Sequence, residues 1–307
     1  MNIAESKMIL LFLSAFVHPH DIAYLTMESI IIKPRNEVLK KYVQYFLFFK
    51  KTDPGFLSYS TFPNNNLCLA IYKENTIDYT SNSKSNNCII TPGNVGFKSR
   101  LFGFHKMPFQ VNISSALDQI CILFEPAALR VFTRESFEDL LAIDHVFDIF
   151  TQKSDFFLEQ LFDENNLLSR AEKLETLLLE NLNVRQSEKM IEALHLIKRG
   201  SEQNLTTEKL AKKLGMSAPT LFRLFKNNIG MNPKSFMNTH RFRNILNEIL
   251  REKQALTHVA YANLYYDQAH FIKDFRSFSG YSPKQLLNKI SIEQNDLAWI
   301  YNNKNHR

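Results

Sequence analysis

The sequence predicts an α+β protein, with a β-rich N-terminal part and an all-helical C-terminal part. Three observations carry this prediction. Residues 28 to about 125 contain short segments rich in β-branched and aromatic residues, whereas later segments follow the helical period of about 3.6 residues. Near the C-terminus, the sequence of residues 220–236 is repeated, with substitutions, about fifty residues later. The chain has 307 residues, of which 45% are hydrophobic, which is enough for two domains with separate cores.

The predicted strands lie between clusters of Asn, Ser, Gly and Pro, as expected of strand ends. The clearest of them are 66–73, 87–93, 95–103, 109–114 and 118–126. Residues 38–49 read as a helix that runs into a strand.

After Pro126 the apolar spacing changes to i, i+3 and i+4, which predicts short helices over 128–132 and 137–141. Longer helices are predicted at 153–162 and 167–182. The apolar stripe of the 167–182 helix fits either a dimer interface or packing on its own domain.

Only short helices are predicted after residue 186. They span 187–200, 205–215, 217–230, 234–252, 256–264, 267–280 and 282–290. Thr206 or Thr207 caps the second of these helices. Ser217 caps the third, and Gly230 ends it.

The net charge of +6 is unevenly distributed. Residues 185–307 carry 20 Lys and Arg against 10 Asp and Glu, and the preceding residues carry 17 against 21. A basic C-terminal part indicates a polyanion as its partner. We therefore predict a β-rich domain with C-terminal helices at 28–184 and a polyanion-binding domain at 185–307.

Each copy of the repeat predicts a helix, a tight turn and a basic second helix, the first over 207–228 and the second over 256–278. In the second helix of the first copy, Leu221 and Phe225 stand four residues apart. This spacing packs one face on the first helix and leaves the polar, basic face for the major groove of DNA. Each copy then continues as Gly, two residues and Pro. The pattern is that of a helix-turn-helix unit.

The second copy reads A-x-x-x-x-Y-x-D-Q-A-H-F-x-x-D-F and then G-Y-S-P-K. Over residues 187–290 the chain closely resembles the AraC/XylS family of bacterial transcription regulators. The resemblance implies a seven-helix DNA-binding domain, a role as an activator, and double-stranded DNA and RNA polymerase as partners. Leu264 departs from the family, which usually has Gly there. A left-handed Leu264 would cost about 1 kcal/mol, unless Asn263 adopts that conformation instead.

The Phe-Glu-Pro-Ala-Ala-Leu stretch at 124–129 stands at a predicted strand-to-helix turn. Together with the strand content and the domain order, it resembles the barrel-like, cupin-like sensor domains of that family. This resemblance implies a sensor or dimerisation domain, a small-molecule effector of unknown identity, and a homodimer. Only His105 lies in the strand region, so we predict no metal and no cofactor.

The two copies supply candidate DNA contacts. The predicted base contacts are Pro219, Thr220, Phe222, Arg223, Gln268, Ala269, His270 and Lys273. The predicted phosphate contacts are Ser217, Lys226, Arg276 and Lys284. Phe222 either presses on thymine methyl groups or belongs to the core. Gln268 either reads an adenine edge or caps its helix beside Asp267. Arg241 and Arg243 are expected to tie the two halves together.

An enzymatic function is a rival prediction, because some relatives of this fold couple DNA binding to alkylation repair through a zinc-held cysteine cluster. The three cysteines are scattered and lack metal spacing, so we predict no enzyme and a reducing, cytoplasmic location. A third alternative is an N-terminal domain that binds only a protein. The apolar run at 8–17 is too short to span a membrane. It is either part of a dispensable or wrongly assigned extension at 1–27 or an export signal.

Overall fold

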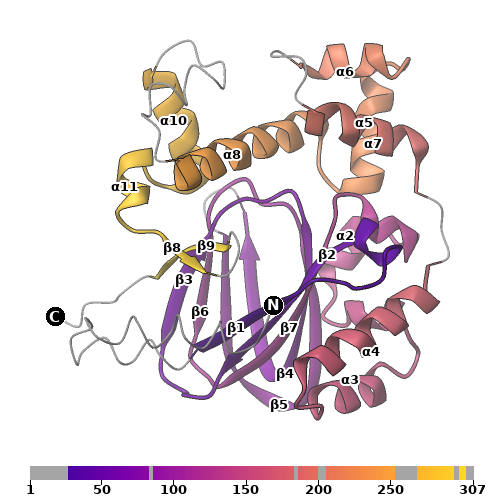
Figure 1. Cartoon of the computed structure of the whole chain (residues 1–307), viewed down its shortest axis with the longest axis vertical. Helices are drawn as coiled ribbons and strands as arrows, with labels where there is room; N and C mark the ends of the chain where they lie inside the picture. The colour runs from indigo at the N-terminus through magenta and orange to yellow at the C-terminus, as the bar shows by residue number, and fades with distance from the viewer. Residues whose placement is uncertain are drawn as a thin grey trace.

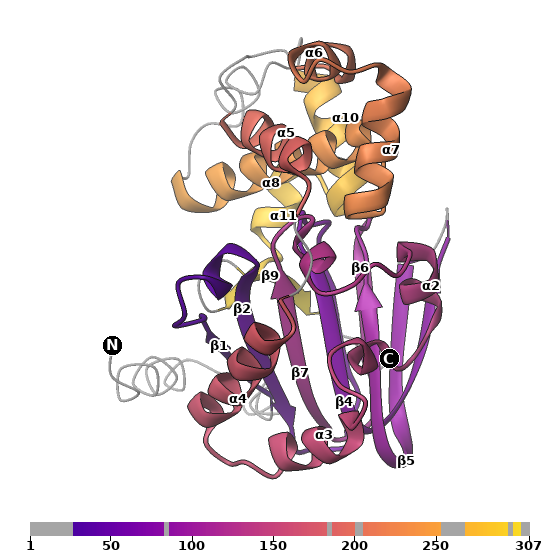
Figure 2. The same ribbon diagram turned by 90° about the vertical axis from the view of Figure 1, so that its right-hand side faces the viewer.

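The computed structural model describes residues 27–82, 86–182, 186–199, 205–252, 268–293 and 297–301. The predicted extension at 1–27 lies outside these ranges except for its last residue. A curled β-sheet with flanking helices forms one half of the molecule, and helices form the other half above it (Figure 1). Figure 2 shows the same two halves from the side. The predicted α+β class, with a barrel-like N-terminal part and a helical C-terminal part, is confirmed.

In the described part of the chain, the sheet has nine strands in the order β1-β2-β7-β4-β5-β6-β3-β9-β8. The strands are β1 (Met27–Ile32), β2 (Val43–Lys51), β3 (Leu57–Thr61), β4 (Leu67–Ser81), β5 (Asn86–Phe102), β6 (Phe109–Ile113), β7 (Leu117–Phe124), β8 (Ser291–Glu293) and β9 (Leu297–Tyr301). Neighbouring strands are antiparallel except for the parallel pair β5 and β6. All five predicted strand segments fall within β4 to β7, although two of them join into the single strand β5.

Strand β5 continues through Pro92 and Gly93, and its extra residues form a bulge opposite Glu74 of β4. The register between the two strands shifts between Lys73 and Asn75, where Glu74 has a φ of 58°. A Cβ on Gly93 would lie 2.5 Å from the backbone carbon of Asn75. Only glycine allows this close approach, so the residues that looked like a turn in the sequence continue the strand.

The two faces of the sheet form two cores, because side chains alternate along each strand. On β7, Ile120 and Ile122 face the flanking helices, whereas Cys121 and Leu123 face the inside of the curl. The helices on the outer face are η3 (Ala128–Val131), α2 (Phe137–Ala142), η4 (Val146–Ile149), α3 (Ser154–Phe162) and α4 (Leu167–Glu180). A short helix, η2 (Leu39–Lys41), precedes β2, so the predicted helix running into a strand at 38–49 is confirmed.

Helix α4 packs on its own domain. Its buried residues Leu174 and Leu178 belong to the outer core. Arg170 lies 3.1 Å from Asp118 on β7, and the Glu175 carboxylate accepts a hydrogen bond from the Arg35 backbone N–H. Of the two readings of this apolar stripe, packing on its own domain accounts for it.

The helical half contains α5 (Glu188–Arg199), α6 (Thr207–Lys213), α7 (Ala218–Ile229), α8 (Pro233–Glu252), α10 (Gln268–Ser279) and α11 (Pro283–Leu287). These agree with six of the helices predicted from the sequence. The predicted helix at 256–264, with Asn263 and Leu264, lies outside the described residues.

The prediction that every element after residue 186 is helical is wrong. The chain returns to the sheet after α11, where β9 pairs with β3 in the register Ser60 with Ile300 and Tyr59 with Tyr301. Ile300 is buried in a core that includes Phe62, which follows β3, and Phe271 of α10. Strand β9 has only five residues and pairs with a strand far away in the sequence, so its own residues show no clear strand pattern.

Candidate nucleic-acid interface

The first helix-turn-helix unit consists of α6 and α7, and side-chain caps set where both helices begin. The Thr206 hydroxyl accepts a hydrogen bond from the backbone N–H of Lys209. The Ser217 hydroxyl accepts one from the backbone N–H of Thr220. Each cap satisfies a backbone donor that the first turn of a helix leaves free. Of the two capping alternatives for α6, the structure selects Thr206.

Helix α7 has one buried and one exposed face. Leu221, Phe225 and Ile229 are buried at the spacing that the sequence indicated. Thr220 and Arg223 are exposed on the other side, and so is Pro219 at the start of the helix. Phe222 is 46% exposed, so it does not belong to the core. The predicted base contacts of the first unit therefore share one accessible side of α7.

Helix α10 repeats this arrangement. Phe271 and Phe275 are buried, whereas Lys273 is exposed. The other exposed candidates of the second unit are Ala269, His270, Arg276 and, on α11, Lys284. Gln268 is the first residue of α10, but its side chain and the neighbouring Asp267 lie outside the described part of the structure.

Helix α8 connects the two units and runs between them (Figure 1). It has 20 residues, which at about 1.5 Å per residue gives a length of about 30 Å. The Arg241 guanidinium on α8 lies 3.1 Å from the Asp274 carboxylate on α10. The expected structural role of Arg241 is thus confirmed. Arg243 instead lines a cavity of the sheet domain.

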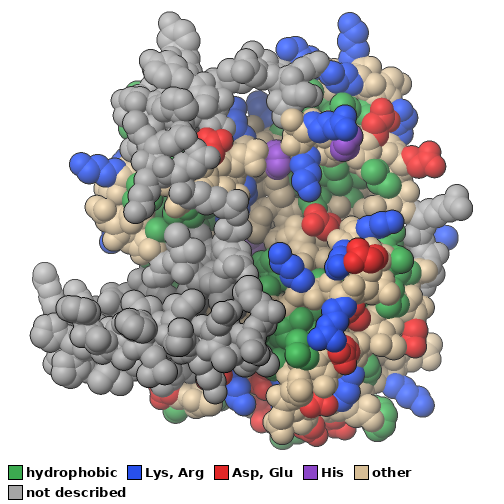
Figure 3. All heavy atoms as spheres, in the orientation of Figure 1, with side chains coloured by type: hydrophobic (Ala, Val, Ile, Leu, Met, Phe, Trp, Pro, Cys, Tyr) green, Lys and Arg blue, Asp and Glu red, His purple; other side chains and the backbone are tan. Residues whose placement is uncertain are grey.

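Basic side chains surround the first unit. Lys209, Lys212 and Lys213 on α6 are exposed, as is Arg223 on α7. Figure 3 shows Lys and Arg side chains gathered over this part of the molecule. Such a patch attracts the phosphates of a nucleic acid.

Two predicted phosphate contacts have further neighbours. The Ser217 hydroxyl is engaged in the cap of α7 and lies 2.9 Å from the Thr220 hydroxyl. Lys226 stands near the C-terminal end of α7, where it lines a groove with Arg134 and Phe137 of the sheet domain. Lys226 is therefore farther from the N-terminal turn of α7 than the base-contact candidates are.

The structure also gathers residues that the sequence leaves scattered. Cys68, Cys88 and Cys121 all line one cavity inside the curled sheet. Cys68 lies opposite Leu123 in the register of β4 and β7, so it is diagonal to Cys121. A hydrogen bond between the Cys68 and Cys121 thiols raises the pKa of Cys121, and all three cysteines are free thiols. In the described residues, no group of three or more His, Cys, Asp or Glu could hold a metal ion.

Among the described residues, no helix combines the length and the hydropathy needed to cross a membrane.

Comparison with known proteins gives matches to the C-terminal part. Residues 210–289 match the family described as "Helix-turn-helix domain". A curated relative, an uncharacterized HTH-type transcriptional regulator of Haemophilus influenzae, is 27% identical over 107 residues. That match covers 35% of this chain and only 36% of the relative's length.

Two solved structures are also similar. The C-terminal domain of AraT, a response regulator from Geobacillus stearothermophilus, is 23% identical, and the match covers 40% of this chain and 98% of that one with a TM-score of 0.33. ToxT from Vibrio cholerae is 10% identical, and the match covers 86% of this chain and 98% of that one with a TM-score of 0.41.

The family match falls on α6, α7, α8, α10 and α11, the elements that form the two units and their connection. It spans nearly all of the segment in which the sequence motifs occur. The segment from 210 to 289 is therefore a helix-turn-helix domain, as the sequence motifs of the C-terminal part predicted.

Proposed function

We propose that the protein is a sequence-specific transcription regulator that reads two successive major grooves and is controlled through its N-terminal domain. The observation that carries the proposal is the matched pair α7 and α10. Each helix buries two aromatic or aliphatic residues four positions apart, and each exposes basic and polar residues on the other side. A surface helix of this kind fits a major groove.

The length of α8 supports reading of successive grooves. Neighbouring major grooves on one face of DNA are about 34 Å apart. The connecting helix spans about 30 Å, and its flanking turns add to the separation. The small deficit favours DNA that bends towards the protein.

Contacts between the two halves support control by the N-terminal domain. The ring of Phe104, which follows β5, lies 6.0 Å from the ring of Phe236 on α8 in an edge-to-face arrangement. Phe62 joins the core of the second unit. A change in the sheet domain would therefore reach both units through packed side chains. An activator would also contact RNA polymerase, and homodimerisation would place two domains on one operator.

The assignment of DNA contacts is part of this proposal. Bases are assigned to Pro219, Thr220, Phe222, Arg223, Gln268, Ala269, His270 and Lys273, and phosphates to Ser217, Lys226, Arg276 and Lys284. The boundaries 28–184 and 185–307 are proposed for the sensor and DNA-binding domains.

A selection from random DNA duplexes with the full chain tests the assignment of contacts. Gln268→Ala should change the preference at one base pair, by about 1–3 kcal/mol. Arg276→Ala should weaken binding to all sequences alike and reduce the salt slope of log affinity by about one unit. Lys289→Ala provides a matched exposed control outside the proposed contacts. An unchanged preference of the Gln268→Ala variant would assign this residue to capping instead.

Footprinting tests the reading of two grooves. Base changes in two blocks, centred about 10 base pairs apart, should each reduce affinity. If only one block matters and the DNA stays straight, one unit reads alone, and the proposal of two readers is wrong.

A further inference from the structure

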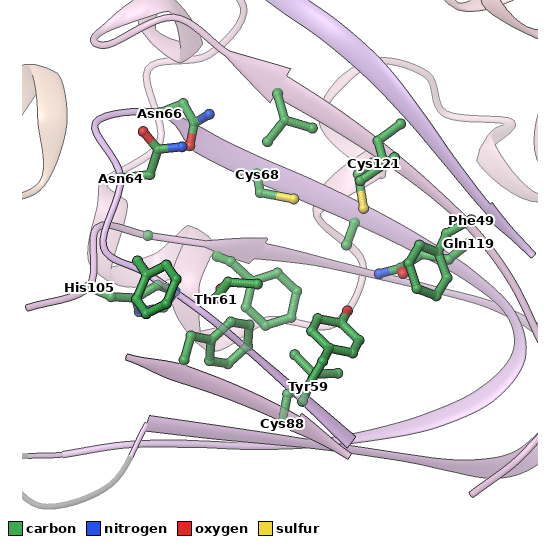
Figure 4. A pocket seen from close by; sticks show the side chains of 18 of the residues that line it. Phe49, Tyr59, Thr61, Asn64, Asn66, Cys68, Cys88, His105, Gln119 and Cys121 are labelled. Carbon is green, nitrogen blue, oxygen red and sulfur yellow. The ribbon is translucent and has the colours of Figure 1, made fainter. Parts of the chain in front are cut away.

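The inside of the curled sheet encloses a cavity of about 170 Å³. Strands β2 to β7 contribute its wall, and Arg243 of α8 also borders it. Figure 4 shows Asn64, Asn66 and His105 at one end and Gln119 at the other. The cavity therefore lies between the sheet domain and the helix that joins the two DNA-binding units.

Aromatic side chains make up much of the wall. They are Tyr45, Phe49, Tyr59, Phe62, Tyr72, Phe102 and Phe109, and His105 is stacked on Phe109 with ring centroids 4.8 Å apart. Mostly apolar walls with a few placed polar groups are typical of small-molecule sites. Aromatic rings on several strands favour a ligand that is itself flat and apolar.

Two polar side chains on this wall, Gln119 and Tyr72, are buried. Gln119 is 7% exposed and Tyr72 is 1% exposed. Gln119 lies on β7 and faces the cavity, whereas the next residue, Ile120, faces the flanking helices. Leaving such a group without a partner is unfavourable. A ligand with one hydrogen-bonding group would satisfy Gln119 or Tyr72 and be oriented by it.

Arg243 is the one charged side chain among the described residues that line the cavity. Among the described lining residues there is no Asp, Glu or Lys, and Arg243 already has an interaction partner in the protein. Burial lowers the pKa of His105 to about 4, so that its ring is neutral at neutral pH. Burial raises the pKa of the Cys88 thiol to about 12, so that this group is neutral as well. Away from Arg243, an ion would lose its hydration among neutral groups without compensation.

The volume is sufficient for one aromatic ring. An apolar cavity of about 150 Å³ is known to hold one benzene molecule. A cavity of about 170 Å³ therefore accommodates one ring with a small substituent.

We infer that this cavity binds an uncharged molecule built on one aromatic ring, with a single hydrogen-bonding group that meets Gln119 or Tyr72. The inference rests on the proposed function, because it names the class of effector through which the N-terminal domain controls DNA binding. Phe62 and Arg243 line the cavity. Phe62 also belongs to the core of the second unit, and Arg243 lies on α8, so a bound ring would lie next to the DNA-binding half.

Three probes of one shape and different charge test the inference on the full chain. They are 4-methylphenol, 4-methylbenzoate and 4-methylbenzylammonium, and binding is measured by titration calorimetry in the absence of DNA. We expect 4-methylphenol to bind at least tenfold more tightly than either ion. Equal or tighter binding of the benzoate would overturn the inference and would identify Arg243 as an anion site.

Two substitutions locate the bound probe. Gln119→Leu keeps the approximate size of the side chain. It should lower the affinity for 4-methylphenol about five- to tenfold, which corresponds to the loss of one hydrogen bond. The matched control Gln110→Leu lies on an exposed position of β6 and should leave the affinity unchanged. Ala70→Leu fills the cavity and should abolish binding. Wild-type affinity in both Gln119→Leu and Ala70→Leu would place the probe elsewhere and refute the site.

Binding to DNA is measured separately on the chain without any probe. If DNA binding is intact and none of the probes binds, the inference on the effector fails and the proposed regulator stands. If 4-methylphenol binds and no DNA does, the proposed function fails instead.

Discussion

Helices α7 and α10 of the two helix-turn-helix units match, but the cores of the units are differently composed. The first unit packs Leu221 and Phe225 with residues of α5, α6 and α8 and with Ala127 of the sheet domain. The second unit packs Phe271 and Phe275 with α8, with Phe62 from the sheet domain and with Ile300 from β9. Both cores therefore use segments outside the family match at 210–289, but only the second uses a strand that follows the helices. A duplicated motif has thus acquired two different attachments, and the second attachment lies beside the cavity.

Ile300→Ala has the largest expected effect. Truncation of a buried isoleucine costs about 2–5 kcal/mol, and Ile300 is 3% exposed. We expect faster hydrogen exchange in α10 than in the wild type, with α7 unchanged, and a selective loss of protection at the DNA block read by the second unit. The control Ile191→Ala, at a half-exposed position of α5, should change stability by less than about 0.5 kcal/mol. Equal loosening of α7 and α10 would mean that the units do not differ in attachment.

Acidification should weaken the cavity side of the molecule. Burial lowers the pKa of His105 to about 4, below its value of about 6.5 in an unfolded chain. Between these values the unfolded chain binds the proton more tightly, so stability is fully present above about pH 6.5 and is lost as the pH falls towards 4. One pKa unit corresponds to about 1.4 kcal/mol, so the loss attains on the order of 3 kcal/mol.

Urea denaturation at pH 7 and pH 5 measures this loss, and His105→Phe is the matched variant because it keeps the stacking on Phe109. The variant should show a smaller drop in its urea midpoint than the wild type. An equal drop in both would assign the pH dependence to other groups, such as His240, whose pKa burial also lowers.

The sequence predicted helices α6, α7 and α10 of the two helix-turn-helix units because local interactions define them. Caps, turn glycines and apolar residues four positions apart lie within a few residues of each other, as at Ser217, Leu221 and Gly230. The strand cores of β4 to β7 were predicted for the same reason. Such features are visible in any single sequence that contains them.

Non-local pairing explains what the sequence did not predict. The three cysteines share a cavity only because β4, β5 and β7 lie side by side in the sheet. Strand β9 is defined by its pairing with β3, which lies more than two hundred positions earlier. The contact between α8 and the cavity likewise depends on how the two halves pack. The sequence therefore did not indicate that Arg243 lines the cavity.

The glycines that end α7 and α10 should differ in how much their substitution destabilises the protein. Gly230 and Gly280 have φ angles of 85° and 76°, where alanine costs about 1–2 kcal/mol. At Gly230 the added Cβ would also lie 3.0 Å from Phe137, whereas at Gly280 it would lie 3.5 Å from Pro108. We therefore expect Gly230→Ala to cost roughly 1 kcal/mol more than Gly280→Ala.

Thermal or chemical unfolding of the two variants measures this difference. Gly215→Ala is the reference, because φ is 65° there and the added Cβ meets nothing within 4 Å. Its cost should match that of Gly280→Ala. If Gly230→Ala cost no more than the reference, Phe137 would have moved aside, and the first unit would be less firmly attached to the sheet domain than its contacts indicate.

The smallest expected effect concerns the ion pair between α8 and α10. The Arg241 and Asp274 side chains are 44% and 26% exposed, and their charged atoms are 3.1 Å apart. An ion pair at the surface contributes about 0.2–1 kcal/mol, because water screens the attraction and two flexible side chains must be ordered. A double-mutant cycle of Arg241→Ala and Asp274→Ala should therefore give a coupling below about 1 kcal/mol that decreases with added salt. A coupling of 2 kcal/mol or more, unchanged by salt, would show that charge rather than the core with Phe62 and Ile300 holds the second unit in place.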